Sequence, residues 1–248
     1  MSGHSKWASI KHSKGLADAK RGQLFTKLIK EITVAARDGG KPEANPRLRV
    51  AIQRAKESNM PQDNIDRAIK KGTGELPGVV YEEITYEGYG PNGVAIIIDV
   101  LTDNKNRTGS EIRNIFAKRG GNMAGSGSVS WMFEKKGYFL IKKGTIDEDK
   151  LMGIALEAGA EDLIDEGDGF AIKTQPQDFE KVKSTLEQKG IKIDTSEITK
   201  LPKSNIRITD KGAAEQVLTL IETLEEHDDI QNVYANFDIP DDLLPEEK

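Results

Sequence analysis

Apolar side chains recur at helical spacing in three successive segments of the first third of the chain. The first segment runs from Gln23 to Gly39 and ends at a pair of glycines. The second begins at Asn45, a residue type that caps helices, and a proline occupies its first helical position. The third follows Pro61 and ends at Gly72, after two lysines that suit the carboxyl end of a helix. The pattern therefore predicts a small unit of three helices.

Beyond residue 74 the apolar pattern changes to short strands that alternate with helices. Strands are predicted over residues 79–87, 94–101 and 129–133. A helix is predicted from Thr108 to Lys118, because Thr108 and Glu111 have the spacing of a capping box. The glycine-rich residues 120–127 are interpreted as a mobile hairpin loop.

Residues 137–200 show the order β-α-β-β-α-β, which is the order of a ferredoxin-like unit. The predicted elements are a strand at 138–141, a helix from the Thr145–Glu148 capping box to Gly159, strands on both sides of the turn 165–169, a helix from Pro176 to Gly190 and an extended segment at 191–201. A helix at 211–226 and a strand at 232–237 remain, and two elements cannot bury a core alone. We expect them to complete the domain begun by residues 94–133, with an extended stretch near 198–208 leading back.

The predicted fold is α+β with three domains. A small amino-terminal helical bundle is followed by two ferredoxin-like α/β sandwiches, and the third domain is inserted in the second. The predicted boundaries are 1–74 for the helical domain, 75–134 plus 196–240 for the discontinuous second domain, 135–195 for the inserted domain and 241–248 for an acidic tail.

Charge is distributed unevenly along the chain. Residues 1–72 hold 16 Lys and Arg against 7 Asp and Glu, a balance of +9, whereas the whole chain carries −5, so residues 73–248 carry −14. This asymmetry indicates that the amino-terminal end meets a polyanion. Trp7 lies among the first cations, where an indole can stack on a base while the cations hold phosphates. A solvated or partner-binding arm is the alternative.

Several kinds of site are excluded by composition and spacing. There are no cysteines, and three scattered histidines do not suit a metal centre. The glycines at 120–127 lack the ending of a phosphate loop, and the acids from Glu161 to Asp168 lack the spacing of a calcium loop. No apolar run suits a membrane span and the start lacks a secretory signal, so we expect a cytoplasmic protein. Neither a cofactor nor catalysis is expected. An enzymatic alternative would use carboxylates such as Asp99 and Asp103.

Basic residues flank the apolar stripe of the predicted middle helix. Arg47 and Arg54 lie on one side of the stripe, with Arg49 and Lys56 on the other. Only Glu57 places an acid among them, which favours a phosphate-facing surface over a solvated one.

A second candidate is the loop at residues 103–108, where a strand ends and a helix begins. Amides at such helix ends bind anions, and Asn104, Asn106 and Arg107 could assist them. A polar turn with good caps is the alternative there. The predicted nucleic-acid-binding residues are Lys6, Trp7, Lys11, His12, Lys14, Lys20, Arg21, Lys27, Lys30, Arg47, Arg49, Arg54, Lys56, Arg67, Lys70, Lys71, Asn104, Asn106 and Arg107.

Short motifs in the chain match a known family. They include Gly3-His4-Ser5-Lys6-Trp7, Phe25-Thr26-Lys27-Leu28, Asn45-Pro46-Arg47-Leu48-Arg49, Asn59-Met60-Pro61 and Tyr86-Glu87-Gly88-Tyr89-Gly90-Pro91. The chain resembles the YebC/PmpR family over essentially its whole length, most densely over residues 1–133. One departure is Ser13-Lys14-Gly15-Leu16, which replaces a more basic, alanine-rich stretch.

The resemblance implies a non-enzymatic, three-domain regulator of gene expression. Bacterial members are described as transcriptional regulators that bind promoter DNA. Relatives that include a mitochondrial translational activator of cytochrome c oxidase act on translation and associate with ribosomes. The sequence has no helix-turn-helix signature, so RNA or the ribosome is favoured over promoter DNA.

The alternative from another class is a protein–protein adaptor whose acidic α+β domains dock a partner. No membrane and no small-molecule substrate are expected as partners, and the sequence is compatible with a monomer.

Overall fold

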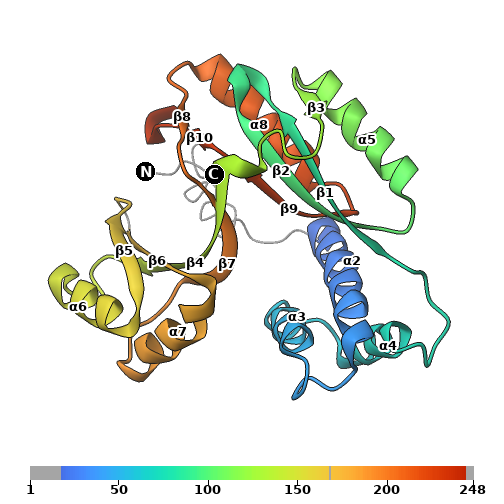
Figure 1. The fold of residues 1–248 in the computed structure, drawn as a ribbon, viewed down its shortest axis with the longest axis horizontal. Helices are drawn as coiled ribbons and strands as arrows, with labels where there is room; N and C mark the ends of the chain where they lie inside the picture. The colour runs from blue at the N-terminus through green and yellow to red at the C-terminus, as the bar shows by residue number, and fades with distance from the viewer. Residues whose placement is uncertain (1–17, 168, 244–248) are drawn as a thin grey trace. The chain divides into compact units, whose positions relative to one another are not determined.

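The computed structural model describes residues 18–167 and 169–243 of the chain, which form two compact units (Figure 1). Within the described residues, one unit consists of 18–128 and 215–233, and the other of 129–214 and 234–243. Each unit has its own helices and its own four-stranded sheet, with β9 ending just beyond the boundary of the first unit. The protein is therefore α+β, as predicted.

The first unit begins with a group of helices, here called the helical unit (residues 18–72). Its elements are α2 (Asp18–Ala35), the 3₁₀ turn η1 (Ala36–Asp38), α3 (Pro46–Glu57) and α4 (Gln62–Gly72). Asn45 caps α3 as predicted, because its side chain accepts a hydrogen bond from Leu48 N at 3.0 Å. The same buried side chain donates to the carbonyls of Ala35 and Gly39, so it joins the start of α3 to the end of α2.

The three helices enclose a small apolar core of their own. Leu28 and Ile32 of α2 pack with Leu48 of α3 and Ile65 of α4. Gly72 lies so close to α2 that a Cβ atom there would sit 2.3 Å from the carbonyl oxygen of Thr33. The packing of α4 on α2 therefore requires glycine at this position.

The first unit continues with a sheet of strand order β3-β1-β2-β9. Its elements are β1 (Glu82–Tyr89), the 3₁₀ turn η2 (Pro91–Gly93), β2 (Ala95–Thr102), α5 (Lys105–Lys118), β3 (Asn122–Ala124), α8 (Lys211–Glu225) and β9 (Ile230–Ala235). Phe116 of α5 reaches the position beside Gly88, and Leu220 of α8 reaches the neighbouring Gly90. Ile96 of β2 lies opposite Gly88 and is fully buried, so both helices cover the same face of this sheet (Figure 1).

Two predicted element starts and one predicted strand in this region are wrong. The first strand begins at Glu82 rather than 79, and Val80 before it is 74% exposed. Helix α5 begins at Lys105 rather than Thr108, because Asn104 supplies the cap by accepting from Arg107 N. The stretch 129–133 is mostly the 3₁₀ turn η3 (Ser130–Met132), and β3 forms instead within the glycine-rich segment.

The glycine-rich loop between β3 and η3 is anchored rather than loose. The buried carboxylate of Glu87 accepts from Gly127 N at 2.8 Å, and the Tyr89 hydroxyl donates to Ser128 O at 3.2 Å. Glu87 points away from the face that α5 covers, since neighbouring residues of a strand face opposite sides. The loop therefore lies against the other side of the sheet.

The second unit contains a sheet of strand order β5-β6-β4-β7. Its elements are β4 (Phe133–Lys142), α6 (Glu148–Ala158), β5 (Ala160–Asp165), β6 (Gly169–Thr174), the 3₁₀ turn η4 (Pro176–Asp178), α7 (Phe179–Gln188) and β7 (Thr195–Pro202). The β-α-β-β-α-β order predicted for this stretch is confirmed. The cap of α6 is Asp147 rather than Thr145, and Gly159 ends the helix with φ of 110°. Phe139 and Phe179 stack in its core with ring centroids 4.7 Å apart.

The chain leaves the first sheet after β3, builds the second sheet, and returns to the first with β9. Near the return, β8 (Ile206–Arg207) pairs in parallel with β10 (Phe237–Asp238), and the 3₁₀ turn η5 (Asp241–Leu243) follows. Among the described residues, no helix has the length and apolar character required to cross a bilayer.

Candidate nucleic-acid interface

Five predicted cations stand exposed on α3 and α4, and we call them the open bases: Arg49, Lys56, Arg67, Lys70 and Lys71. Arg49 makes only a long contact, 3.4 Å, from its Nη1 to the carbonyl of Pro42. Within the part of the chain that the structure describes, the other four side chains form no hydrogen bond or ion pair. Their charges are therefore available to an external anion.

Two further predicted cations of α3 are exposed but paired. Arg47 binds both carboxylate oxygens of Glu83, at 2.9 and 2.8 Å, and Arg54 lies 3.3 Å from Glu31. The hydrogen bonds between Arg47 and Glu83 raise the pKa of the guanidinium and lower the pKa of the carboxyl. Pairs this exposed contribute only about 0–1 kcal/mol, so a phosphate could replace either acid.

Two predicted cations of α2, Lys27 and Lys30, contact the end of α8 and the loop after it, together with the uncharged Gln23. Gln23, Lys27 and Lys30 follow one another at spacings of four and three residues, so they share one face of the helix. They donate to the last carbonyls of α8 and the loop after it: Gln23 to Glu226 at 3.2 Å, Lys27 to Glu225 at 2.6 Å and Lys30 to Asp228 at 2.9 Å. Carbonyls at a helix end lack partners within the helix and attract cations, which explains the arrangement.

Lys30 is therefore a correction to the predicted interface. It is only 7% exposed, and its Nζ lies 2.5 Å from Asp229 Oδ1. Lys27 is half-buried and faces α8 in the same way. Periodicity placed both lysines on α2 but could not show that α8 would cover them.

Asp229 is the centre of the charged contacts between α2, β2 and α5. Its Oδ2 accepts from the hydroxyl of Thr108 at 2.6 Å, from Arg107 at 2.8 Å and from Thr102 at 3.2 Å. Burial opposes ionisation of this carboxyl, but the hydrogen bonds from Lys30, Thr108 and Arg107 outweigh it and hold its pKa far below the usual range. No local pattern in the sequence marks this role, because the donors to Asp229 lie 121 to 199 positions away from it in the chain.

Arg107 is the second correction. Its guanidinium donates to Asp229 and to Asp103, at 2.8 and 2.9 Å, and its Nε lies 3.9 Å from Glu111. Three carboxylates around one guanidinium repel a phosphate, so this side chain does not suit the predicted contact. Asn104 is the cap of α5, and among the three predicted residues Asn106 keeps an exposed side chain without such a role.

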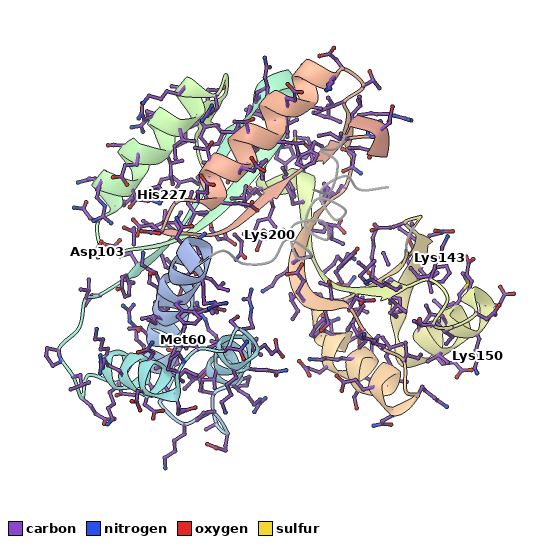
Figure 2. The ribbon with its side chains drawn as sticks, turned by 180° about the vertical axis from the view of Figure 1, so that it is seen from behind. Met60, Asp103, Lys143, Lys150, Lys200 and His227 are labelled. Carbon is purple, nitrogen blue, oxygen red and sulfur yellow. The ribbon has the colours of Figure 1, made fainter. Side chains whose placement is uncertain are left out.

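A cleft of about 580 Å³ opens beside these groups and is lined by Gln23, Thr26, Tyr81, Asp103 and His227, among others. Figure 2 shows Asp103 and His227 near the amino-terminal end of α2. Atoms of Glu111, His227 and Asp229 come within 4.8 Å of one another, as metal ligands would. Arg107 already supplies the cation between the two carboxylates, and His227 Nδ1 accepts from Asp229 N at 3.1 Å. The candidate ligand atoms are thus already bonded to protein partners, which disfavours a metal ion there.

The remaining predicted contacts lie at the amino terminus. Lys6, Trp7, Lys11, His12 and Lys14 fall outside the described residues. Lys20 belongs to α2, but its side chain is also outside the description, and Arg21 is exposed.

These features define an α+β protein with exposed bases concentrated on an amino-terminal helical unit. Residues 5–75 match the family described as the TACO1/YebC protein N-terminal domain, and residues 81–237 match the TACO1/YebC second and third domain. The chain belongs to the TACO1/YebC family, which is a non-enzymatic family. The resemblance seen in the sequence motifs is thereby confirmed.

Similar proteins align with the whole chain. A probable transcriptional regulatory protein of Desulfatibacillum aliphaticivorans is 57% identical, with 100% of both chains covered. One from Dictyoglomus thermophilum is 59% identical over 98% of both chains. The crystal structure of a conserved hypothetical protein from Aquifex aeolicus is 49% identical, with a TM-score of 0.85 over 97% of this chain and 100% of the other.

Proposed function

We propose that this protein is a nucleic-acid-binding regulator of gene expression. Within the described residues, the open bases of α3 and α4 form its contact surface. The observation that carries the proposal is that Lys56, Arg67, Lys70 and Lys71 are exposed and, among the described residues, make no side-chain hydrogen bond or ion pair. The names of the relatives, probable transcriptional regulatory proteins, support a role in gene expression. On the same ground we propose that the protein acts in the cytoplasm.

We further propose RNA, within the ribosome or alone, as the target in preference to promoter DNA. Helices α3 and α4 are joined by four residues, a length that a helix-turn-helix also uses. In that motif the first residues of the second helix contact base edges. The first half of α4 carries exposed Asp63 and Asp66, whereas its bases lie at the carboxyl end. Acids in that position oppose entry into a DNA groove but do not prevent the end of α4 from meeting a phosphate backbone.

The test compares two variants with equal loss of charge. One carries Arg67→Gln, Lys70→Gln and Lys71→Gln on α4. The control carries Lys181→Gln, Lys189→Gln and Lys192→Gln, which are exposed residues in and after α7. Affinity for a structured RNA and for a promoter duplex is measured over a range of salt concentrations. Each lost phosphate contact should reduce the log–log salt slope by roughly 0.7 to 0.9, in the α4 variant only. If both variants bind with equal affinity and equal salt slope, Arg67, Lys70 and Lys71 do not contact the nucleic acid.

A protein–protein adaptor is the second candidate. It is favoured by the acidic carboxyl-terminal segment, where residues 196–248 hold 5 Lys and Arg against 13 Asp and Glu. In that case the wild-type protein would bind neither nucleic acid, and association with ribosomes or polymerase would survive the loss of the open bases.

We infer that the three predicted domains hold, with one boundary moved: the helical domain at 1–74, the discontinuous domain on both sides of the insertion, and an inserted domain of 133–202 rather than 135–195, because β7 (Thr195–Pro202) pairs with β4 (Phe133–Lys142) in its sheet. Both sheets support the inference, because their strand orders are β9-β2-β1-β3 and β7-β4-β6-β5. In each sheet a helix links a central strand to an edge strand, as in an antiparallel, ferredoxin-like arrangement. The two sheets differ in where one central strand comes from. In the discontinuous domain this strand is β1, which comes first in the chain, whereas in the inserted domain it is β6, which lies in the middle of the domain's sequence.

A further inference from the structure

Several hydrogen bonds and ion pairs join the helical unit to the sheet domain that follows it. The apolar core of the helical unit contains residues of α2, α3, α4 and the short segments that join them. Lys27, Lys30, Arg37 and Arg47 reach from the helical unit to the sheet domain and form hydrogen bonds or ion pairs with it. We call this set of contacts the joint. A polar joint fixes an orientation through a few directional bonds, so individual residues decide it.

One carboxylate in the joint holds two separate elements. Asp229 Oδ1 accepts a hydrogen bond from Lys30 of α2. Its Oδ2 accepts hydrogen bonds from Thr108 and Arg107, at the start of α5. Helix α2 carries α3 and α4, and therefore the open bases. The first turn of α5 carries Lys105 and Asn106, both exposed. Asp229 thus links the helix that carries the open bases to the start of α5, beside the other contacts of the joint.

We propose that Asp229 is a positioning residue for nucleic-acid binding, which fixes the helical unit so that one strand contacts both the open bases and Lys105 at the start of α5. The inference rests on the proposed function for its binding part. Its structural part, the fixed orientation, stands on the geometry of the joint alone.

Burial and bonding explain why Asp229 controls the joint and exposed pairs do not. Asp229 is 5% exposed and both its oxygens are occupied by donors. Asparagine would replace one oxygen by an N–H donor that faces Lys30 or the Thr108 and Arg107 donors, and would leave Lys30 buried without a counter-charge. Glu83, which pairs with Arg47 across the same joint, is half-exposed and can exchange its partner for water. Glu83→Gln is therefore a matched control.

The orientation is measured by the distance between two spin labels. The chain has no cysteine, so Gln62→Cys on α4 and Asn114→Cys on α5, both exposed, provide the only labelling sites. In the full chain we expect one narrow distance distribution that persists in Glu83→Gln and becomes broad in Asp229→Asn. Lys30→Met provides a second variant if Asp229→Asn does not fold. A broad distribution in the parent, or an unchanged narrow one in both joint variants, would overturn the proposal.

The link to binding is measured by a double-mutant cycle with a structured RNA. Lys105→Gln is introduced into the parent and into Asp229→Asn, and affinity is followed against salt concentration. In the parent, the substitution should lower the salt slope by roughly 0.7 to 0.9. In the Asp229→Asn background it should change nothing further, because the start of α5 is no longer held against the strand. Equal effects in both backgrounds would contradict positioning.

The two failures remain distinguishable. If the proposed function is wrong, the parent protein and the α4 variant bind RNA equally poorly, and the label distances alone decide the structural part. If only the positioning is wrong, the α4 variant loses binding while the Asp229 cycle is additive.

Discussion

At the scale of single residues, chemical type does not decide what a cation of this protein does. Lys30 and Lys70 both lie on helices of the helical unit, yet Lys30 is buried against Asp229 and Lys70 is exposed. Breaking a buried pair by removing one partner costs about 3–5 kcal/mol, whereas an exposed lysine contributes little to stability. Stability and binding therefore depend on different lysines, and the two effects can be measured separately.

The pH dependence of stability should report Asp229. Its pKa is lowered in the folded protein, so the stabilisation is complete above the unfolded value of about 3.9 and is lost as pH falls toward the folded value. We expect Asp229→Asn to reduce the free energy of unfolding by about 3 kcal/mol at pH 7. The difference from the parent should shrink steadily below about pH 4. Urea denaturation across this range is the measurement, and a constant difference down to pH 2 would contradict the assignment.

At the scale of elements, the same substitution should have opposite effects in two helices. At Gly72 an added Cβ would meet backbone and side-chain atoms of α2, starting with Thr33 O at 2.3 Å. Gly153 lies inside α6, where an added Cβ would meet nothing within 4 Å. The first glycine is required by packing, and the second has no such requirement within its own unit.

Gly72→Ala should therefore destabilise the protein by about 1–3 kcal/mol, since the helical core must shift to admit the methyl group. Gly153→Ala should stabilise it by roughly 0.5–1 kcal/mol, because alanine is the better helix former. Thermal unfolding of both variants checks the pair. A stabilising Gly72→Ala would mean that α4 does not pack against α2 as described.

At the scale of the whole molecule, charge separates a binding part from an acidic remainder. The exposed face of α8 carries Glu215 and Glu222, exposed Glu226 follows directly after the helix, and the carboxyl end of α8 faces Lys27 and Lys30 of α2. Uncompensated acids repel nucleic acid over a Debye length of about 8–10 Å at ordinary salt. The acidic surface should thus orient the bound polyanion toward the helical unit.

Crosslinking of the bound protein should follow this separation. We expect labelled peptides from residues 1–72 and from the start of α5, and little labelling of α8 and β9. Mass spectrometry of the crosslinked peptides is the measurement. Strong labelling of Glu222-containing peptides, in particular, would show that the acidic face and not the helical unit meets the nucleic acid.

Much of the fold could be predicted from local signals. Helical periodicity located α2 to α4, the cap at Asn45 and the glycine after α2 marked their ends, and the β-α-β-β-α-β order of the second sheet followed from strand and turn patterns. One error lies where a side chain takes part in a contact with a residue far away in the sequence. Thr108 has the spacing of a cap, but its hydroxyl binds Asp229, and Asn104 caps α5 instead.

The sequence alone therefore determined the class of elements, their approximate bounds, the family and the concentration of positive charge at the amino-terminal end. Each of these depends on residues that are neighbours in the chain or on composition. Only the tertiary structure decided which cations are open, because the partner of Lys30 is 199 positions away and the donors to Asp229 come from α2, β2 and α5. Burial and pairing depend on which distant segments meet, and no local pattern records that.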